Sequence, residues 1–252
     1  MKYKNLTLIG TSHVSAQSVA EIKHTIEKVK PEAVAVELDV NRLQALMTEQ
    51  KSKLSIRDIL QIGLKGYLFA KIGGWVQQKI GQIVRVKPGS DMRIAVITAD
   101  KEKSKIYLID QHIQITLKNL SKRLTWRERG RMVVDVFRAM IYREKELAKW
   151  GIKNWDLTTV PDKHVISKMI NQVKKRYPNI YGVLIDDRNK IMAKRLVKIM
   201  KQHDGIVVGV VGAGHEEGMM KEMKRIWNSV EVVKTKNSKK TETTHKINIS
   251  SK

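Results

Sequence analysis

The sequence predicts an α/β fold in which a central, mostly parallel sheet is flanked by helices. Two observations indicate this class. Short apolar runs alternate along the chain with longer stretches in which apolar residues recur at helical spacing, a pattern typical of parallel sheets. The hydrophobic content of 42% over 252 residues is also sufficient for one sizeable core.

The first elements alternate as strand, helix, strand and helix. Residues 5–9 and 33–38 are short aliphatic runs that predict strands, and residues 15–29 between them keep the helical period. Either Asp39 or Asn41 is suited to cap the second helix, because both side chains accept hydrogen bonds from backbone N–H groups.

A long amphipathic segment follows the second strand. Residues 54–86 carry aliphatic side chains at helical spacing, interrupted at Gly73-Gly74, with Asp58 as their only acid. We interpret them as a helical insertion that covers the site as a lid or packs as a hairpin, with a helix on a membrane surface as the alternative. Residues 86–92 predict a turn and a helix start, with Ser90 as the cap.

The second half of the chain continues the pattern. Residues 106–110 predict a third strand, and Pro161 and Pro178 are expected to begin and end a helix. The other expected elements are a basic helical segment over 113–149, a fourth strand at the start of 182–196 that enters a helix after Asp186-Asp187-Arg188, a fifth strand over 205–214, a helix over 217–227 and a strand over 229–233.

We expect a single α/β domain over residues 1–233, with the insertion at about 54–86 and the basic helical segment at about 113–149 inside it. Residues 234–252 hold six Lys and one Glu with almost no apolar residues, which predicts a disordered basic tail.

The net charge of +24 indicates attraction to polyanions, so nucleic acid and anionic membrane surfaces are candidate partners of the basic surface. A merely solvated basic surface is the alternative. The absence of cysteine excludes disulfides, thiolate metal ligands and a cysteine nucleophile. No signal peptide or apolar run of ~20 residues is found, so we expect a cytoplasmic protein, with peripheral membrane attachment as an alternative.

Two copies of one motif carry the functional prediction. Gly10-Thr11-Ser12-His13 and Gly212-Ala213-Gly214-His215 each follow an apolar strand and deliver a histidine. Ligands of open α/β sheets bind outside the carboxyl ends of the strands. We therefore expect one site built from the residues that end successive strands: His13, Glu37, Asp110, Asp187, Arg188 and His215.

These residues resemble the TraB/PrgY pheromone-shutdown family, within a Tiki-type superfamily that takes in GumN, erythromycin esterases and ChaN haem-binding proteins. The matching stretches span almost the whole chain: GTSHVSAQSV (10–19), AVELDVNR (35–42), VKPGSDM (86–92), LIDDRNKIMA (184–193) and VVGAGHEEGM (210–219). The resemblance implies hydrolase-like chemistry, with proteolysis fitting the suppression of a peptide pheromone. It also implies a site with His13, Glu37 and His215 at its core and Arg188 as their charged partner.

The chain departs from the family pattern in two places. Many TraB-like chains carry C-terminal transmembrane helices, whereas this one ends in a polar tail. Where the family pattern is Asp-Arg-Asp after the third strand, this chain has Asp110-Gln111-His112. The arginine is therefore missing there, and His112 either adds a ligand or fills the gap.

Two histidines and a carboxylate suit Mn²⁺, Co²⁺, Zn²⁺ or Fe²⁺. We expect His13, Glu37 and His215 to ligate the ion, with Glu37 as ligand or general base and His13 also counted as catalytic. Arg188 would hold a substrate carboxylate or the oxyanion. The expected supporting residues are Asp187 and Asp110 as reserve carboxylates, His112, and three glycines that allow close approach and positive φ: Gly10, Gly212 and Gly214.

The sequence leaves three functions open. A metal-dependent hydrolase acting on peptides, or on esters, comes first. A non-catalytic protein that binds a small ligand or haem in the same pocket, and a polyanion-binding protein, are the alternatives. Glu37 has a purely structural alternative as the ion-pair partner of Arg42 or Arg188. A homodimer is also open, and His24, His164, His203 and His245 are expected at the surface.

Overall fold

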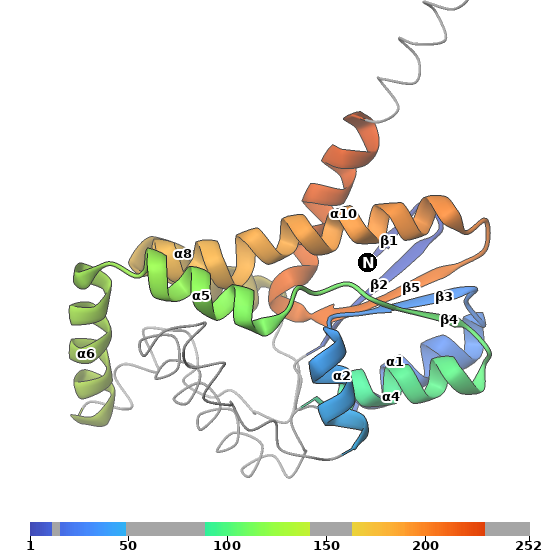
Figure 1. Cartoon of the computed structure of the whole chain (residues 1–252), viewed down its shortest axis with the longest axis horizontal. Coiled ribbons are helices and arrows are strands. Elements are labelled where there is room, and N and C mark those ends of the chain that lie inside the picture. Colours follow the sequence, from blue (N-terminus) through green and yellow to red (C-terminus); the bar gives the residue numbers. More distant parts are fainter. Residues whose placement is uncertain (12–15, 49–88, 142–162, 230–252) are drawn as a thin grey trace, which may run out of the picture.

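The computed structural model describes residues 1–11, 16–48, 89–141 and 163–229 (Figure 1). Within these ranges, five strands form one sheet in the order β1-β2-β5-β3-β4. β1 (Lys2–Tyr3) joins the edge antiparallel to its neighbour. The other strands run parallel: β2 (Leu6–Thr11), β3 (Ala33–Val36), β4 (Lys105–Leu108) and β5 (Val207–Gly212). The predicted α/β class with a mostly parallel sheet is confirmed.

The register of the sheet brings the strand ends together. Ala33 of β3 pairs with both Lys105 of β4 and Val207 of β5, and Val207 also pairs with Leu6 of β2. The parallel strands therefore start level. Because they are similar in length, the residues that follow them emerge at one carboxyl edge.

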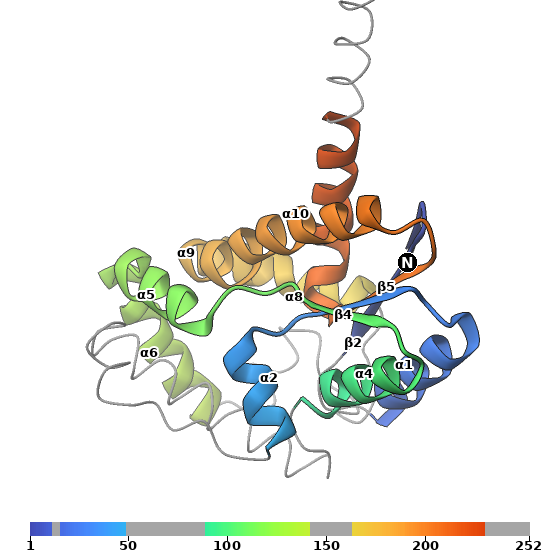
Figure 2. The same cartoon turned by 45° about the vertical axis from the view of Figure 1, so that its right-hand side comes forward.

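One face of the sheet is covered by α1 (Ala16–Val29) and α4 (Ser90–Lys101), which pack against each other (Figures 1 and 2). Alternate strand residues point into this layer, as the two-residue period of a strand requires. The short α2 (Val40–Met47) contacts α4 at the edge of the layer. The buried residues of this core are Ile9, Val34, Val36, Val208 and Val210 from strands, Ile22, Ile26, Met92, Ala95, Val96 and Ala99 from helices, and Leu38.

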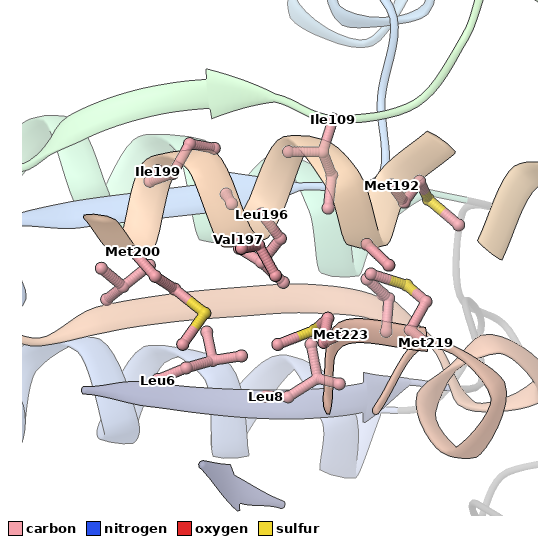
Figure 3. Packing of buried hydrophobic residues seen from close by; sticks show 14 of the residues in the cluster. Leu6, Leu8, Ile109, Met192, Leu196, Val197, Ile199, Met200, Met219 and Met223 are labelled. Atoms are coloured by element: carbon pink, nitrogen blue, oxygen red, sulfur yellow. The ribbon is translucent and has the colours of Figure 1, made fainter. Parts of the chain in front are cut away.

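The opposite face is covered by α10 (Asp187–Gln202) and by a helix over 213–229 (Figure 3). Met192, Leu196 and Met200 of α10 meet Leu6 and Leu8 of the sheet in one buried cluster. Both faces are covered, which explains why the strands read as continuous apolar runs rather than alternating ones.

Gly209 lets α10 approach the central strand. A Cβ atom at this position would lie 2.8 Å from Leu8 Cδ1 and 3.4 Å from Leu196 Cδ2. The glycine of β5 is therefore a packing requirement of the sheet–helix contact.

Four further helices extend from the sheet: α5 (Ile113–Arg123), α6 (Trp126–Ile141), α8 (Lys163–Arg176) and α9 (Pro178–Tyr181). They share a small core of their own made by Leu120, Tyr177, Ile180 and Val183. Figures 1 and 2 both place α6 at the end of the molecule that is remote from the sheet. The described part of the basic helical segment, 113–141, is helical as predicted.

The predicted fourth strand is wrong. Residues Gly182–Asp186 form a π-helical turn, η1, that joins α9 to α10. Pro178 is one source of the error, because it occupies the first turn of α9, where proline is tolerated, instead of only ending a helix. A short apolar run cannot be told from a buried helical turn by its periodicity alone.

Smaller differences concern helix ends. Asp39 caps α2 as predicted, since Asn41 and Arg42 donate their backbone N–H groups to Asp39 Oδ1. Ser90 is not the cap of α4; Gly89 takes that place with φ of 84°. The last helix begins at 213 rather than 217, so the fifth strand ends at Gly212 and Ser229 is helical rather than extended.

Some predictions fall outside the described residues: His13, the insertion over 54–86, Pro161, the strand residues 230–233 and the tail over 234–252. They remain predictions. In the ranges that the structure covers, no helix is both long enough and apolar enough to cross a membrane.

Candidate functional site

Arg188, in the first turn of α10, is the centre of a buried charged cluster. Its Nε and Nη2 atoms donate to the two carboxylate oxygens of Asp110, at 3.1 and 2.7 Å. Nη2 also donates to Glu37 Oε1. Bidentate arginine–carboxylate pairs of this kind are the stronger class of hydrogen-bonded ion pair and fix the geometry of both partners.

The guanidinium of Arg188 stays charged in this setting. Burial by itself lowers the pKa of Arg188, but the Glu37 charge and the hydrogen bonds that Arg188 donates to Asp110 outweigh burial, so the pKa is raised. Its remaining N–H groups are also engaged, because Nη1 lies 3.3 Å from the Leu184 carbonyl and 3.1 Å from His215 Nε2.

His215 lies in the first turn of the 213–229 helix and is 5% exposed. Its Nδ1 is 2.7 Å from Asn189 Oδ1. An amide oxygen can only accept a hydrogen bond, so this contact assigns the ring proton to Nδ1. The Nε2 lone pair then faces Arg188, and Nε2 lies 3.5 Å from Glu37 Oε1.

Glu37 directly follows β3 and is 2% exposed. Its backbone N–H donates to the Val210 carbonyl, which continues the β3–β5 pairing by one residue. On its side chain, Oε2 accepts from the Gly212 N–H at 2.7 Å. The sheet itself therefore holds the carboxylate of Glu37 in front of His215.

Two more arginines reach Asp110, one from α2 and one from α10 itself. Arg42 of α2 donates to Asp110 Oδ2 at 3.1 Å, and Arg195 of α10 donates to the Asp110 carbonyl at 2.6 Å. Gln111, where the family pattern has arginine, instead donates to Thr116 at 2.8 Å. The Arg42 side chain is 35% exposed and that of Arg188 is 14% exposed, while Arg195 lies at the exposed surface of α10.

The sequence of this chain matches the family model described as the TraB/PrgY/gumN family over residues 2–225. The chain belongs to the TraB/PrgY/gumN family. This match covers the sheet, both helical layers and the whole Arg188 cluster, so the candidate site lies entirely within the family domain.

Relatives of this TraB/PrgY/gumN chain occur in archaea and animals. It is 35% identical over 243 residues to "Uncharacterized protein MJ1365" of Methanocaldococcus jannaschii, covering 94% of this chain and 59% of that protein. It is 23% identical to the TraB domain-containing proteins of Homo sapiens, over 90% of this chain and 64% of that protein, and of Bos taurus, over 85% and 61%. The chain therefore spans roughly three fifths of the length of these relatives.

Four of the predicted site residues are brought together: Glu37, Asp110, Arg188 and His215. Three others lie elsewhere or cannot be placed. Asp187 accepts from Arg123 of α5 at 2.8 Å, and Asn189 rather than Asp187 accepts from His215. His112 is 53% exposed at the start of α5, 3.7 Å from Asp39. His13 is outside the described residues.

The glycines of the two motifs were expected to allow both positive φ and close approach of neighbouring atoms. Among the described glycines, Gly89 has positive φ, whereas Gly10, Gly212 and Gly214 do not, so the expectation of positive φ is wrong. Close approach does hold at Gly10, where a Cβ would lie 2.9 Å from Glu216 Oε2. At Gly214 it would meet Ile170 Cδ1 only at 3.7 Å, an ordinary contact.

Two supporting residues were not predicted from the sequence. Asn189 fixes the proton of His215, and Gly218 makes room for Asn189, because a Cβ at 218 would lie 2.3 Å from Asn189 Nδ2. Asn189 directly follows Arg188 in the stretch LIDDRNKIMA (184–193), and this position next to a predicted site residue could have pointed to it. The pairing with Gly218 depends on how α10 crosses the last helix and has no signature in the sequence.

The donor atoms present were compared with those of a divalent metal site. Glu37 Oε1 and His215 Nε2 are 3.5 Å apart, close to the roughly 3.4 Å that separates two ligands of a tetrahedral ion with bonds of about 2.1 Å. Within the described ranges, no group of three His, Asp or Glu side chains is placed to hold a metal. Both atoms are also hydrogen-bond partners of Arg188, and His13 is outside the described residues, so the metal site remains a prediction.

Proposed function

We propose that this TraB/PrgY/gumN chain is a metal-dependent hydrolase that cleaves peptides, with its site at the carboxyl edge of the sheet. The observation that carries the proposal is the Nε2 lone pair of His215, held beside the Glu37 carboxylate and the Arg188 cation in a buried setting. Buried histidine and carboxylate groups with fixed proton positions are the usual components of hydrolytic sites.

Each residue has a distinct task in this proposal. His215 Nε2 would give up its contact with Arg188 Nη1 to ligate the metal or accept a proton, and Asn189 would keep its ring in the required orientation. Glu37 is a ligand or the general base that takes a proton from water. All five N–H groups of Arg188 are engaged by Asp110, Glu37, Leu184 and His215, so Arg188 acts through its charge rather than through a free donor. Arg42, which is more exposed than Arg188, is better placed than Arg188 to meet a substrate carboxylate.

The metal would be held by His13, Glu37 and His215. Such an ion lowers the pKa of a bound water and polarises a substrate carbonyl. The choice of peptides over esters rests on the resemblance to pheromone-shutdown proteins.

Hydrolysis is tested with protein loaded with Mn²⁺, Co²⁺, Zn²⁺ or Fe²⁺ and a library of peptides and esters. We expect cleavage of at least one substrate class, reduced at least about 100-fold in Glu37→Gln, since general acid–base groups contribute on that order. Glu222→Gln is the matched control, because Glu222 pairs with Arg225 on the surface of the last helix. No cleavage above the Glu37→Gln background by fully loaded protein would refute the proposal.

A non-catalytic ligand-binding protein is the second candidate, and the charge balance of the cluster favours it. Glu37 and Asp110 are already neutralised by Arg188 and Arg42 without an added ion. In that case the protein binds a small ligand or haem and hydrolyses nothing. Haem titration would then give an absorption change that disappears in His215→Asn.

A further inference from the structure

The outward face of α6 is apolar although it is exposed. Trp126, Val133 and Val134 are 78%, 56% and 48% exposed. At about 100° of rotation per residue, these three and Gly130 fall within an arc of about 100° on one side of the helix. A Cβ added at Gly130 would meet nothing within 4 Å, which confirms that this side is open.

The acidic side chains of α6 are turned away from this face. Glu128 is 2% exposed and accepts from the backbone N–H and the side chain of Asn179, at 2.9 and 3.0 Å. Asp135 is bound by Arg176 and Tyr177. These are the two acids in the sequence of α6, so no carboxylate of this helix remains on its outward side.

Basic side chains flank the apolar face instead. Arg127, Arg131 and Arg138 are exposed and share the side of the helix next to Val134. Arg129 stacks over the Trp126 ring, with its guanidinium carbon 4.6 Å from the ring centroid. The face therefore combines an exposed tryptophan and a valine pair with a row of arginines.

We propose that this face of α6 is the surface by which the protein docks on an anionic phospholipid bilayer. Helices that lie in the membrane interface carry an apolar face with Trp and aliphatic residues and a polar face rich in Arg or Lys. The arginine row of α6 matches the negative potential of anionic lipids. Figures 1 and 2 place α6 at the end of the molecule that is remote from the sheet, and the exposure of Trp126, Val133 and Val134 shows that this side of the helix is open.

Two other occupants fit the face less well. A second copy of the chain would bring the rows made by Arg127, Arg131 and Arg138 together, and like charges oppose that contact. Nucleic acid would pair with the arginines but would leave Val133 and Val134 exposed to water, since its phosphate backbone has no apolar surface to cover them. A bilayer can cover the apolar side chains with its acyl chains and pair the arginines with its anionic headgroups. This inference does not depend on the proposed hydrolysis.

The test is flotation of the full chain with vesicles of phosphatidylcholine, with or without phosphatidylglycerol. We expect binding only when phosphatidylglycerol is present. Arg127→Gln/Arg138→Gln should weaken it about 30-fold, and Val133→Gln/Val134→Gln at least about ten-fold. The matched controls change the same kinds of exposed side chain on other helices: Lys23→Gln/Lys28→Gln on α1 for the charges, and Ile97→Gln on α4 for the aliphatic group. Their binding to the vesicles should fall much less than that of the α6 variants.

A second readout places the contact on α6. The tryptophan emission should shift to shorter wavelength on addition of anionic vesicles, and Trp126→Phe should remove most of that shift while the protein still binds. Equal binding by the α6 variants and their controls would overturn the proposal, because general charge would then explain it. The proposal would also be overturned if the protein dimerised without vesicles and Val133→Gln/Val134→Gln abolished the dimer. Binding of DNA that depends on the α6 arginines, without any binding of vesicles, would overturn it as well. Circular dichroism of each variant checks that it is folded.

Discussion

Asn189 and Gly218 show how closely His215 is supported. The Asn189 amide occupies the space that any side chain at 218 would need. Gly218→Ala should therefore displace Asn189 from His215 and destabilise the protein by about 1–3 kcal/mol, the usual effect of overpacking.

Thermal unfolding measures this change, and NMR of the His215 Nδ1 proton reports the lost contact. Gly130→Ala is the control, because its added methyl meets nothing within 4 Å and replaces a glycine inside α6. That variant should gain up to about 1 kcal/mol. Equal stability of the two variants would contradict the account of Gly218.

Arg188 is predicted to hold the site together. Arg188→Met would leave Glu37 and Asp110 buried without their shared cation, and breaking a buried pair in this way costs about 3–5 kcal/mol. Arg123→Met removes a more exposed partner of Asp187 and should cost no more than about 1 kcal/mol. Denaturant unfolding compares the two, and similar losses would show that the Arg188 cluster is not a structural centre.

At the scale of elements, Glu32 ties the turn before β3 to the end of α10. Its carboxylate accepts from the Gly205 N–H at 3.0 Å and lies 2.5 Å from His203 Nδ1, whose Nε2 is 2.9 Å from the Tyr107 hydroxyl. His203 is 4% exposed, so its predicted surface position is wrong. Its place at the end of a basic helix gave no sign that His203 would be buried in these contacts.

The Glu32 contacts predict a pH dependence. The hydrogen bond from His203 and then that from Gly205 lower the pKa of Glu32 below its usual 4.5. A lowered carboxylate pKa stabilises the fold above the unfolded value, and this contribution is lost as pH falls through the folded value. Glu32→Gln should thus unfold at a lower temperature than wild type at neutral pH, and the difference should shrink at about pH 3.

Glu21→Gln, on the exposed side of α1, is the control and should behave as wild type at both pH values. A Glu32→Gln deficit that stays constant from neutral to acidic pH would show that the Glu32 charge is not the cause.

Short aliphatic runs in the sequence were sufficient to predict four of the strands but also led to one wrong prediction. β2, β3, β4 and β5 were predicted because each is a short aliphatic run between helical patterns, and packing on both faces requires such runs. The strand expected at 182–186 carried the same signal but is a π-helical turn. Such turns often occur at functional sites, and this one leads directly to Arg188.

At the scale of the whole molecule, the sequence predicted the edge at which the site forms. Parallel strands place the residues that follow them together, so Glu37, Asp110 and His215 could be grouped before any coordinates. Arg188 was predicted as the charged partner of Glu37 and His215, and the structure pairs it with Glu37. The contacts of Arg42 and Arg195 with Asp110, and of Asn189 with His215, were not predicted, because they depend on how α2 and α10 lie against the sheet.

In the proposed function, His13, Glu37 and His215 would together hold one divalent metal ion at this edge. The most direct test is elemental analysis of protein dialysed against trace Mn²⁺, Co²⁺, Zn²⁺ and Fe²⁺. His24→Ala, on the exposed side of α1, is the control for loss of a histidine. The account predicts about one ion per chain in wild type and in His24→Ala, and none in His13→Ala/His215→Ala. Equal retention by the double variant, or no metal in wild type, would contradict it.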